Sequence, residues 1–296
     1  MPIQDRSYRA YEGELHRGLA WWVIARQELR VLFATRFFFW LTLLGGIHFA
    51  ARVVQVIGCD ILAANPNTPL SEALKGMRDL SAFWVVDERL FFQFLEGQSS
   101  ILFWILLFAG SGMICEDIRY NLMEVYFSKP ITWRDYALGK IMALVLVGLL
   151  LTAVPGLILV TLHNFLSPGW ETLRTSYWWP GSILIFSIAL VVPCSLFILA
   201  GSALFRSQRV AGIAVFILLM ADLSLANILS DDLLNNSNFS LIGAPFAIGH
   251  LGESLFHQNH SLINLGWTWS LSVILCVSGI FLGVICRQVY RCEAAG

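Results

Sequence analysis

The 296-residue sequence predicts an all-α integral membrane protein, with six transmembrane helices behind an amphipathic interfacial helix. Hydrophobic residues make up 57% of the chain and charged residues only 13%, and the mean hydropathy is +0.70. A soluble domain has slightly under half apolar residues and about a quarter charged ones. This composition therefore excludes a disordered chain, a basic nucleic-acid-binding domain and an ordinary soluble enzyme.

Six stretches reach the roughly 20 mostly apolar residues that a helix needs to cross a hydrocarbon core of about 30 Å. They are Phe37–Gly58, Gln98–Cys115, Ile141–Leu162, Tyr177–Phe205, Val210–Ser230 and Leu262–Cys286. Pro155 and Pro193 fall inside the third and fourth stretches and predict kinks. Neighbouring helices are expected to bind the backbone carbonyls that each proline leaves free.

The distribution of Lys and Arg predicts the orientation in the membrane. With the N-terminus inside, 14 of the 19 basic residues fall on the inner side, so both termini are predicted to be cytoplasmic. The chain divides into an N-terminal segment, 1–36, and a transmembrane domain, 37–296, with an inner loop at 116–140 and long outer loops at 59–97 and 231–261. The apolar run 241–251, interrupted by Gly243, Pro245 and Gly249, is typical of a re-entrant or interfacial element.

The segment Trp21–Phe33 reads as a helix lying on the inner membrane face. Its apolar and aromatic residues share one arc at helical spacing, and Arg26 and Arg30 lie on another. One interpretation is a simple anchor that sets the topology. The other is an elbow helix that also receives force from a cytoplasmic partner.

The inner loop carries the most specific pattern in the chain. It reads as a short amphipathic helix, a turn at Pro130, and a second helix that continues into the third span. Ser128 and Thr132 can cap a helix, and Asp135 falls in a first turn, where the helix dipole favours an acidic residue.

The sequence of this loop resembles that of the corresponding loop in the type 2 ABC transporter permease family. In that family an acidic residue closes the second span, a Pro-Ile or Pro-Val step follows a short helix, and an Arg–acid–Tyr–x–x–Gly–Lys run opens the third span. The matching residues are Glu116 or Asp117, Pro130-Ile131, Arg134-Asp135-Tyr136 and Gly139-Lys140. Trp133 departs from the pattern, because a basic residue is common at that place in the family.

The resemblance implies a permease subunit that is not itself catalytic and is driven by a separate ABC-type ATPase, which would hold ATP and Mg. It also implies a second permease copy, as a homodimer or a heterodimer, in a bacterial inner membrane, with no role for nucleic acid. Gly139-Lys140 is not a P-loop of this chain's own, because Ile141 follows it and Arg134 stands where the leading Gly is required. The residues expected to couple to the ATPase are Glu116, Asp117, Glu124, Tyr126, Phe127, Pro130, Arg134, Asp135, Tyr136, Gly139 and Lys140. Among them Tyr126 and Phe127 are the expected aromatic anchors.

Three polar residues inside the spans are candidates for a substrate pathway. Asp222 lies well inside the fifth span, and an ionisable group at such a depth is a functional hypothesis by default. A structural hydrogen-bonded role is the alternative. His48 and Arg52 lie four residues apart on one face of the first span, as a boundary feature or as partners for Asp222. The histidines of the last outer loop match no metal-binding signature.

Two other functions compete with the permease. The first is an ATPase-coupled membrane scaffold or mechanotransmitter that moves no cargo. The second is an intramembrane enzyme that uses His48, Asp222 or the loop histidines, although no Ser-His, Cys-His or paired-metal spacing supports it. The sequence leaves the transported substrate unassigned.

Overall fold

A computed structural model describes residues 19–64, 86–129, 131–167, 169–233, 236–258, 263 and 265–295, and within these ranges no residue lies in a strand. The first half comprises α1 (Ala20–Ala34), α2 (Arg36–Ala64), α4 (Glu88–Gly110), α5 (Cys115–Arg119), α6 (Leu122–Phe127), α7 (Trp133–Leu151) and α8 (Ala153–Leu166). The second half comprises α9 (Trp170–Ser176), α10 (Trp179–Leu204), α11 (Gln208–Asn227), the π-helix η2 (Ile228–Leu233), the 3₁₀-helix η3 (Ser237–Ile242), α12 (Ala244–Leu255) and α13 (Trp267–Ala295).

Six helical stretches of the described chain are long and apolar enough to cross a membrane, and each contains most of one predicted span. They are Arg36–Ile61, Glu88–Arg119, Trp133–Leu166, Leu173–Leu204, Gln208–Ser230 and Trp267–Glu293. The second, third and fourth are 61%, 56% and 61% buried over their most apolar part, whereas the first, fifth and sixth are 11%, 11% and 17% buried. The prediction of an all-α, multi-pass membrane protein is therefore confirmed. Three spans form the centre, and the other three present apolar faces outwards.

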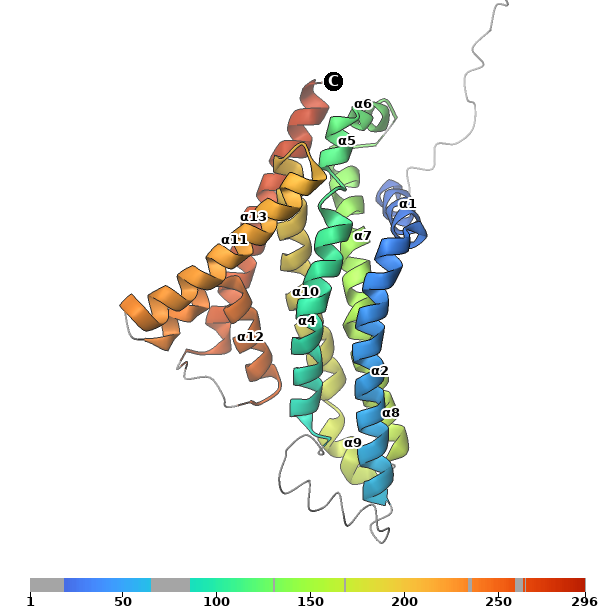
Figure 1. Cartoon of the computed structure of the whole chain (residues 1–296), viewed down its shortest axis with the longest axis vertical. Helices are drawn as coiled ribbons and strands as arrows, with labels where there is room; N and C mark the ends of the chain where they lie inside the picture. Colours follow the sequence, from blue (N-terminus) through green and yellow to red (C-terminus); the bar gives the residue numbers. More distant parts are fainter. Residues whose placement is uncertain are drawn as a thin grey trace, which may run out of the picture.

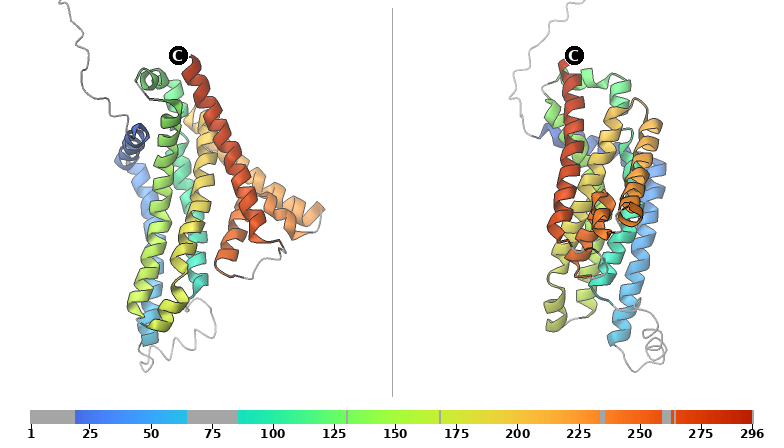
Figure 2. Two further views of the ribbon diagram at one scale, coloured as in Figure 1. Left: turned by 180° about the vertical axis from the view of Figure 1, so that it is seen from behind. Right: turned by 90° about the vertical axis from the view of Figure 1, so that its left-hand side faces the viewer.

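The long helices run side by side between two ends of the molecule (Figure 1). One end holds α5, α6 and the last residues of α13, and the opposite end holds α9 and the end of α2. The central helix α10 contacts α4, α7, α8, α11 and α13. The left view in Figure 2 shows α11 leaning away from α2, and the right view shows α1 crossing the direction of the spans.

The second span begins about ten residues earlier than predicted. The side chain of Asp87 accepts a hydrogen bond from the backbone N–H of Leu90 at 3.2 Å, which caps α4 and starts the helix at Glu88. Phe91 and Phe94 are fully buried against the bundle. Because α2 also continues to Ala64, the segment between the two helices is shorter than the predicted outer loop 59–97.

The apolar run of the last outer loop forms a helix that its proline starts and does not break. Pro245 stands in the first turn of α12, where its missing N–H costs nothing and its fixed backbone angle favours the helix. The helix then continues through Gly249 to Leu255 and packs against α10 and α13. The predicted interruption is thus confined to the residues before Ala244.

At Pro155 the structure agrees with the prediction that a neighbouring helix binds the carbonyl left free by the proline. This residue lies three positions into α8, next to the discontinuity between α7 and α8 at Thr152. A proline at 155 has no N–H for the carbonyl of Leu151, four residues before it. Gln98 of α4 supplies the missing donor, with its Nε2 donating to the Leu151 oxygen at 3.0 Å. A neighbouring span therefore binds the carbonyl that the proline leaves free.

Candidate functional site

The candidate site lies where the inner loop meets the bundle, at the end that holds α5 and α6 (Figure 1). The two short helices are joined through Asn121, which has a left-handed backbone (φ 55°) that asparagine tolerates better than most residues. Glu116 is exposed, whereas Asp117 is buried. Of the two acidic residues that match the family pattern, it is therefore Asp117 that enters the interior. Pro130 lies outside the described residues.

The start of α7 is fixed by a capping box. Thr132 Oγ1 accepts a hydrogen bond from the N–H of Asp135 at 3.3 Å, and the Asp135 carboxylate accepts one from the N–H of Thr132 at 3.2 Å. The two side chains thus satisfy two of the donors that a helix start leaves free. This confirms Thr132 as a cap and gives Asp135 a local structural role.

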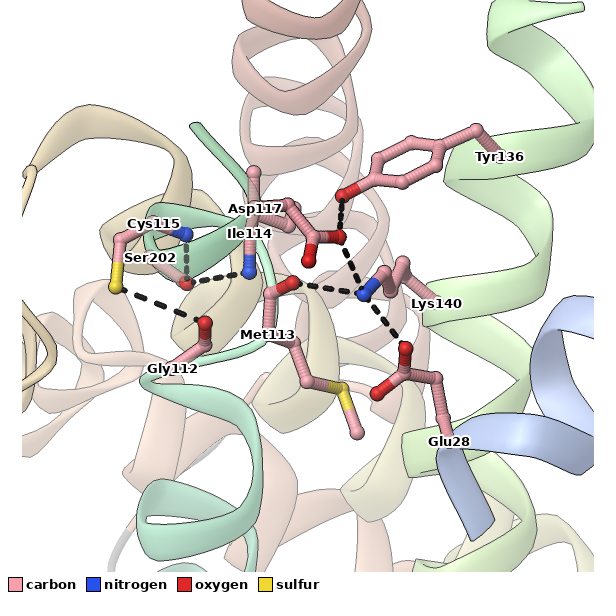
Figure 3. A network of polar contacts seen from close by, with 9 residues as sticks. All are labelled: Glu28, Gly112, Met113, Ile114, Cys115, Asp117, Tyr136, Lys140 and Ser202. Carbon is pink, nitrogen blue, oxygen red and sulfur yellow. Dashed lines mark hydrogen bonds and ion pairs between the residues drawn. The ribbon is translucent and has the colours of Figure 1, made fainter. Parts of the chain in front are cut away.

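Lys140 is the centre of a buried network that joins three segments of the chain (Figure 3). Its Nζ lies 2.7 Å from Glu28 Oε1 on α1 and 2.7 Å from Asp117 Oδ2 on α5, and it donates to the carbonyl of Met113 at 2.8 Å. The phenol of Tyr136 donates to the same Asp117 oxygen at 2.6 Å. An ammonium group has three donors, and here each one has an acceptor.

Burial gives this network its energetic weight. The side chain of Lys140 is 2% exposed, and those of Glu28 and Asp117 are 16% and 11% exposed. A charge removed from water at such depth is tolerated only when its partners surround it. Removing one partner from a buried ion pair typically costs about 3–5 kcal/mol, because the other charge is left uncompensated. The arrangement therefore holds α1, α5 and α7 in one fixed geometry.

A break between α4 and α5 brings Asp117 to Lys140. The chain turns from Gly110 to Ile114, and two backbone N–H groups there, those of Ile114 and Cys115, donate to Ser202 Oγ at 3.0 and 3.1 Å. The carbonyl of Met113 in the same turn accepts a hydrogen bond from Lys140. Side chains of α7 and α10 therefore bind backbone N–H and C=O groups that the break leaves without partners in a helix (Figure 3). Buried backbone groups require such partners.

Gly139 lets α1 pack closely on α7. A Cβ at this position would lie 2.8 Å from the backbone oxygen of Trp21 and 2.8 Å from Cβ of Ile24, closer than atoms can pack. Small residues permit this kind of close helix contact within membranes. Ile24, Ala25 and Leu32 are accordingly the buried residues of α1. Gly139 and Lys140 thus both bind α1, one through close packing and the other through charge.

The two aromatic residues expected to dock the partner point inwards. The rings of Tyr126 and Phe127 lie 5.3 and 6.2 Å from the ring of Tyr136, centroid to centroid, and both side chains are half-buried. Burial raises the pKa of Tyr126, although the charge of Lys140 acts in the opposite direction. These rings therefore fix α6 to α7.

The apolar side chains that α5 and α6 expose are different ones. Leu122 and Val125 on α6 and Tyr120 between the two helices are 40%, 56% and 63% exposed. Glu124 is exposed beside them, and Arg134 lies over the ring of Trp133, with its Cζ 5.3 Å from the ring centroid. The outer surface of the loop is thus an apolar patch with charged neighbours, and we call Tyr120, Leu122 and Val125 the α6 patch.

The three candidate pathway residues are not brought together. Asp222 accepts a hydrogen bond from the N–H of Ala244 at 3.0 Å, at the first residue of α12. His48 Nδ1 lies 2.8 Å from Gln98 Oε1, and Arg52 donates to Gln55 at 2.8 Å. Because α11 and α2 lie on opposite sides of the molecule in Figure 1, Asp222 does not partner His48 or Arg52. The contact of Asp222 is of the structural, hydrogen-bonded kind.

Sequence reasoning did not single out two residues with important contacts. Glu28 is one of them, although it is the only acidic residue in α1, and this isolation was the available signal. Asp60 is the other, and its Oδ2 lies 2.9 Å from Nδ1 of His163 between α2 and α8. Asp60 and His163 are both buried, and Trp179 stacks on the His163 ring with the ring centroids 5.7 Å apart. The pair ties the first span to the third at the end opposite the Lys140 network.

Comparison with models of known protein families gives no match for this chain, and comparison with curated proteins gives none either.

Proposed function

We propose that this chain is the transmembrane permease subunit of an ABC transporter, which moves a substrate across a bacterial inner membrane with energy from a separate ATPase. A second permease copy, identical or related, would complete the transmembrane unit. ATP and Mg would be bound by the ATPase, since Gly139-Lys140 lacks the Ser or Thr and the leading Gly of a P-loop.

The observation that carries the proposal is the Lys140 network beneath the α6 patch. A partner that pushes on α5 and α6 transmits force only if these helices cannot yield independently. Asp117 and Tyr136 fix α5 to α7, and the rings of Tyr126 and Phe127 fix α6 to the same helix. The helix α5 lies at the end of span two and α7 begins span three, so a displacement of the patch would be passed to the centre of the bundle.

The place of α1 fits the same role. In the proposed topology α1 is an elbow helix at the cytoplasmic membrane surface, with Arg26 and Arg30 exposed towards the headgroups. Through Glu28 it is bound to the same lysine as α5. We call α5, α6 and the start of α7 the coupling segment. The helix α1 would therefore move with the coupling segment, as an elbow helix that receives force should, and would be more than a topological anchor.

The test begins with a search for an ABC-type ATPase that is encoded beside this chain's gene or co-purifies with the chain, and continues with a binding and hydrolysis measurement on that ATPase. The two are co-expressed, and the chain is then reconstituted in nanodiscs and titrated with the purified ATPase. Val125→Asp places a carboxylate in the α6 patch, and burying an unpaired charge in a docked interface is costly. We expect the variant to bind the ATPase at least tenfold more weakly and to lose its effect on ATP hydrolysis.

Leu173→Asp is the matched control, because Leu173 is a similarly exposed residue (48%) on α9, at the opposite end of the molecule. This variant is expected to bind the ATPase as the unaltered chain does. Normal binding by Val125→Asp, or no binding by the unaltered chain, would contradict the proposal. Stimulation of hydrolysis by a fraction of the host's lipids or peptides would separate a permease from a scaffold that moves no cargo.

A further inference from the structure

The last span extends to the level of the coupling segment. The 29 residues of α13 span about 44 Å at 1.5 Å per residue, well beyond a hydrocarbon core of about 30 Å. Its final turns reach the height of α6 in Figure 1, past the level of α1. Ile285 and Val289 in this part are fully buried, and α13 contacts both α6 and α7 there. These turns are thus packed against the coupling segment and do not project freely.

Trp133 makes the connection between α7 and α13. The ring of Trp133 lies 6.1 Å from that of Tyr290 in an edge-on arrangement, and its backbone N–H donates to Glu293 Oε1 at 3.4 Å. Trp133 is the first residue of α7, so this N–H is one of the donors that the helix leaves free. A basic residue, which is common here in the resembled family, would not provide this aromatic contact. The tryptophan that stands at position 133 in place of the common basic residue therefore makes a contact with the last span.

The surface formed in this way carries mainly positive charge. The exposed charged residues of 116–135 and 285–293 are Arg119, Lys129, Arg134, Arg287 and Arg291 on the basic side, and Glu116 and Glu124 on the acidic side, while the acidic Asp135 and Glu293 are only partly exposed. Arg287 and Arg291 are four residues apart and therefore share one face of α13. Tyr290 lies next to Arg291 and is 56% exposed despite its contact with Trp133.

We propose that Arg287, Tyr290 and Arg291 of α13, together with Arg134, form a second wall of the ATPase-docking surface and bind an acidic segment of the ATPase. This inference rests on the proposed function and extends it to the sixth span. Force on this wall reaches α13 directly, and through Phe281, whose ring lies 5.0 Å from that of Phe197, it reaches α10. The ATPase would then drive three spans, the second, third and sixth, from one surface.

A protein partner fits this wall better than lipid headgroups do. In the proposed topology α1 lies at the headgroup level, and α6 and the end of α13 lie beyond it. Basic residues interact with anionic headgroups within about a Debye length of the membrane surface, whereas residues farther out meet cytoplasmic partners. The exposed aromatic ring of Tyr290 between two arginines is also typical of a protein interface.

The test compares two arginine pairs with the same spacing. Arg287→Gln/Arg291→Gln removes the pair on α13, and Arg26→Gln/Arg30→Gln removes an exposed pair on α1. Each variant is reconstituted in nanodiscs of phosphatidylcholine alone and, in parallel, in nanodiscs that also contain anionic lipid, and its affinity for the ATPase is titrated at several salt concentrations. We expect the α13 variant to bind about tenfold more weakly and with a smaller salt dependence, because two screened attractions are lost. The α1 variant should bind normally.

Unchanged affinity and salt dependence in the α13 variant would overturn the inference, and so would an equal loss in both variants. A loss that appears only in nanodiscs with anionic lipid would assign the arginines to the membrane and overturn it as well. The Val125→Asp variant distinguishes a failure of this inference from a failure of the proposed function. If Val125→Asp abolishes binding while the α13 variant binds normally, the coupling role stands and only the second wall is wrong.

Discussion

At the scale of single residues, the fixed geometry of the site depends on one lysine. Lys140 satisfies two carboxylates and one backbone carbonyl from segments that are far apart in sequence, since Glu28 lies 112 residues before it. The energetic weight of such a group comes mainly from what its loss would leave behind. Without the ammonium, the buried Asp117 and the largely buried Glu28 would be two carboxylates with no cation between them, and their repulsion would add to the cost of burial.

Lys140→Met is therefore expected to lower the free energy of unfolding by about 3–5 kcal/mol, measured by denaturation in detergent micelles. Lys129→Met is the control, because Lys129 is exposed, and its change should stay within about 0.5 kcal/mol. Adding Glu28→Gln and Asp117→Asn to Lys140→Met should restore part of the loss, because no buried charge then remains. If Lys140→Met proved as stable as Lys129→Met, the network would not hold α1, α5 and α7 in one fixed geometry.

At the scale of elements, α1 and α7 show how one glycine sets a helix contact. Gly139 lies where the backbone of α1 passes, and the glycine and the lysine after it together fix α1 in place. A glycine in a helix interior normally costs about 1 kcal/mol relative to alanine. Here that cost is offset by close packing that any larger residue would prevent.

Gly139→Ala should consequently destabilise the protein, by about 1–3 kcal/mol, because the added methyl group overpacks the contact with Trp21 and Ile24. Gly279→Ala in α13 is the matched control, since a Cβ there would meet nothing within 4 Å. That control should be neutral or slightly stabilising in the same thermal or chemical unfolding measurement. Equal effects of the two substitutions would show that α1 is not tightly packed at Gly139.

The membrane-spanning helices were largely predictable, because a span needs a run of apolar residues and such a run is visible in the sequence. The capping box at Thr132 and Asp135 was partly readable, since its residues are three apart. Helix starts were harder, as the early start of α4 at Glu88 shows. Neither the direction of Tyr126 and Phe127 nor the pairing of Glu28 with Lys140 could be predicted, because both depend on packing between distant segments.

At the scale of the whole molecule, the outward faces of the first, fifth and sixth spans determine its surroundings. Val54, Ile213 and Leu275 are 70%, 61% and 62% exposed, one on each of these spans. Apolar surfaces this extensive are not stable in water, so lipid or another protein must cover them. The proposed second permease copy would occupy part of this surface and lipid the rest. With six such helices, the two ends of the molecule are expected to lie on opposite sides of a membrane.

The orientation of these ends is the prediction on which the coupling role depends. In a variant with its six cysteines replaced by serine, a single cysteine is introduced either at Ser128, next to α6, or at Asn236, before η3; both positions are exposed. The excess of Lys and Arg on the side of α6 predicts that this side is cytoplasmic. A membrane-impermeant maleimide should therefore label Asn236→Cys in right-side-out vesicles, and Ser128→Cys only after permeabilisation, with the cysteine-free chain as background. Labelling of Ser128→Cys in sealed vesicles would place α5, α6 and the end of α13 outside, where no ATP-driven partner could reach them.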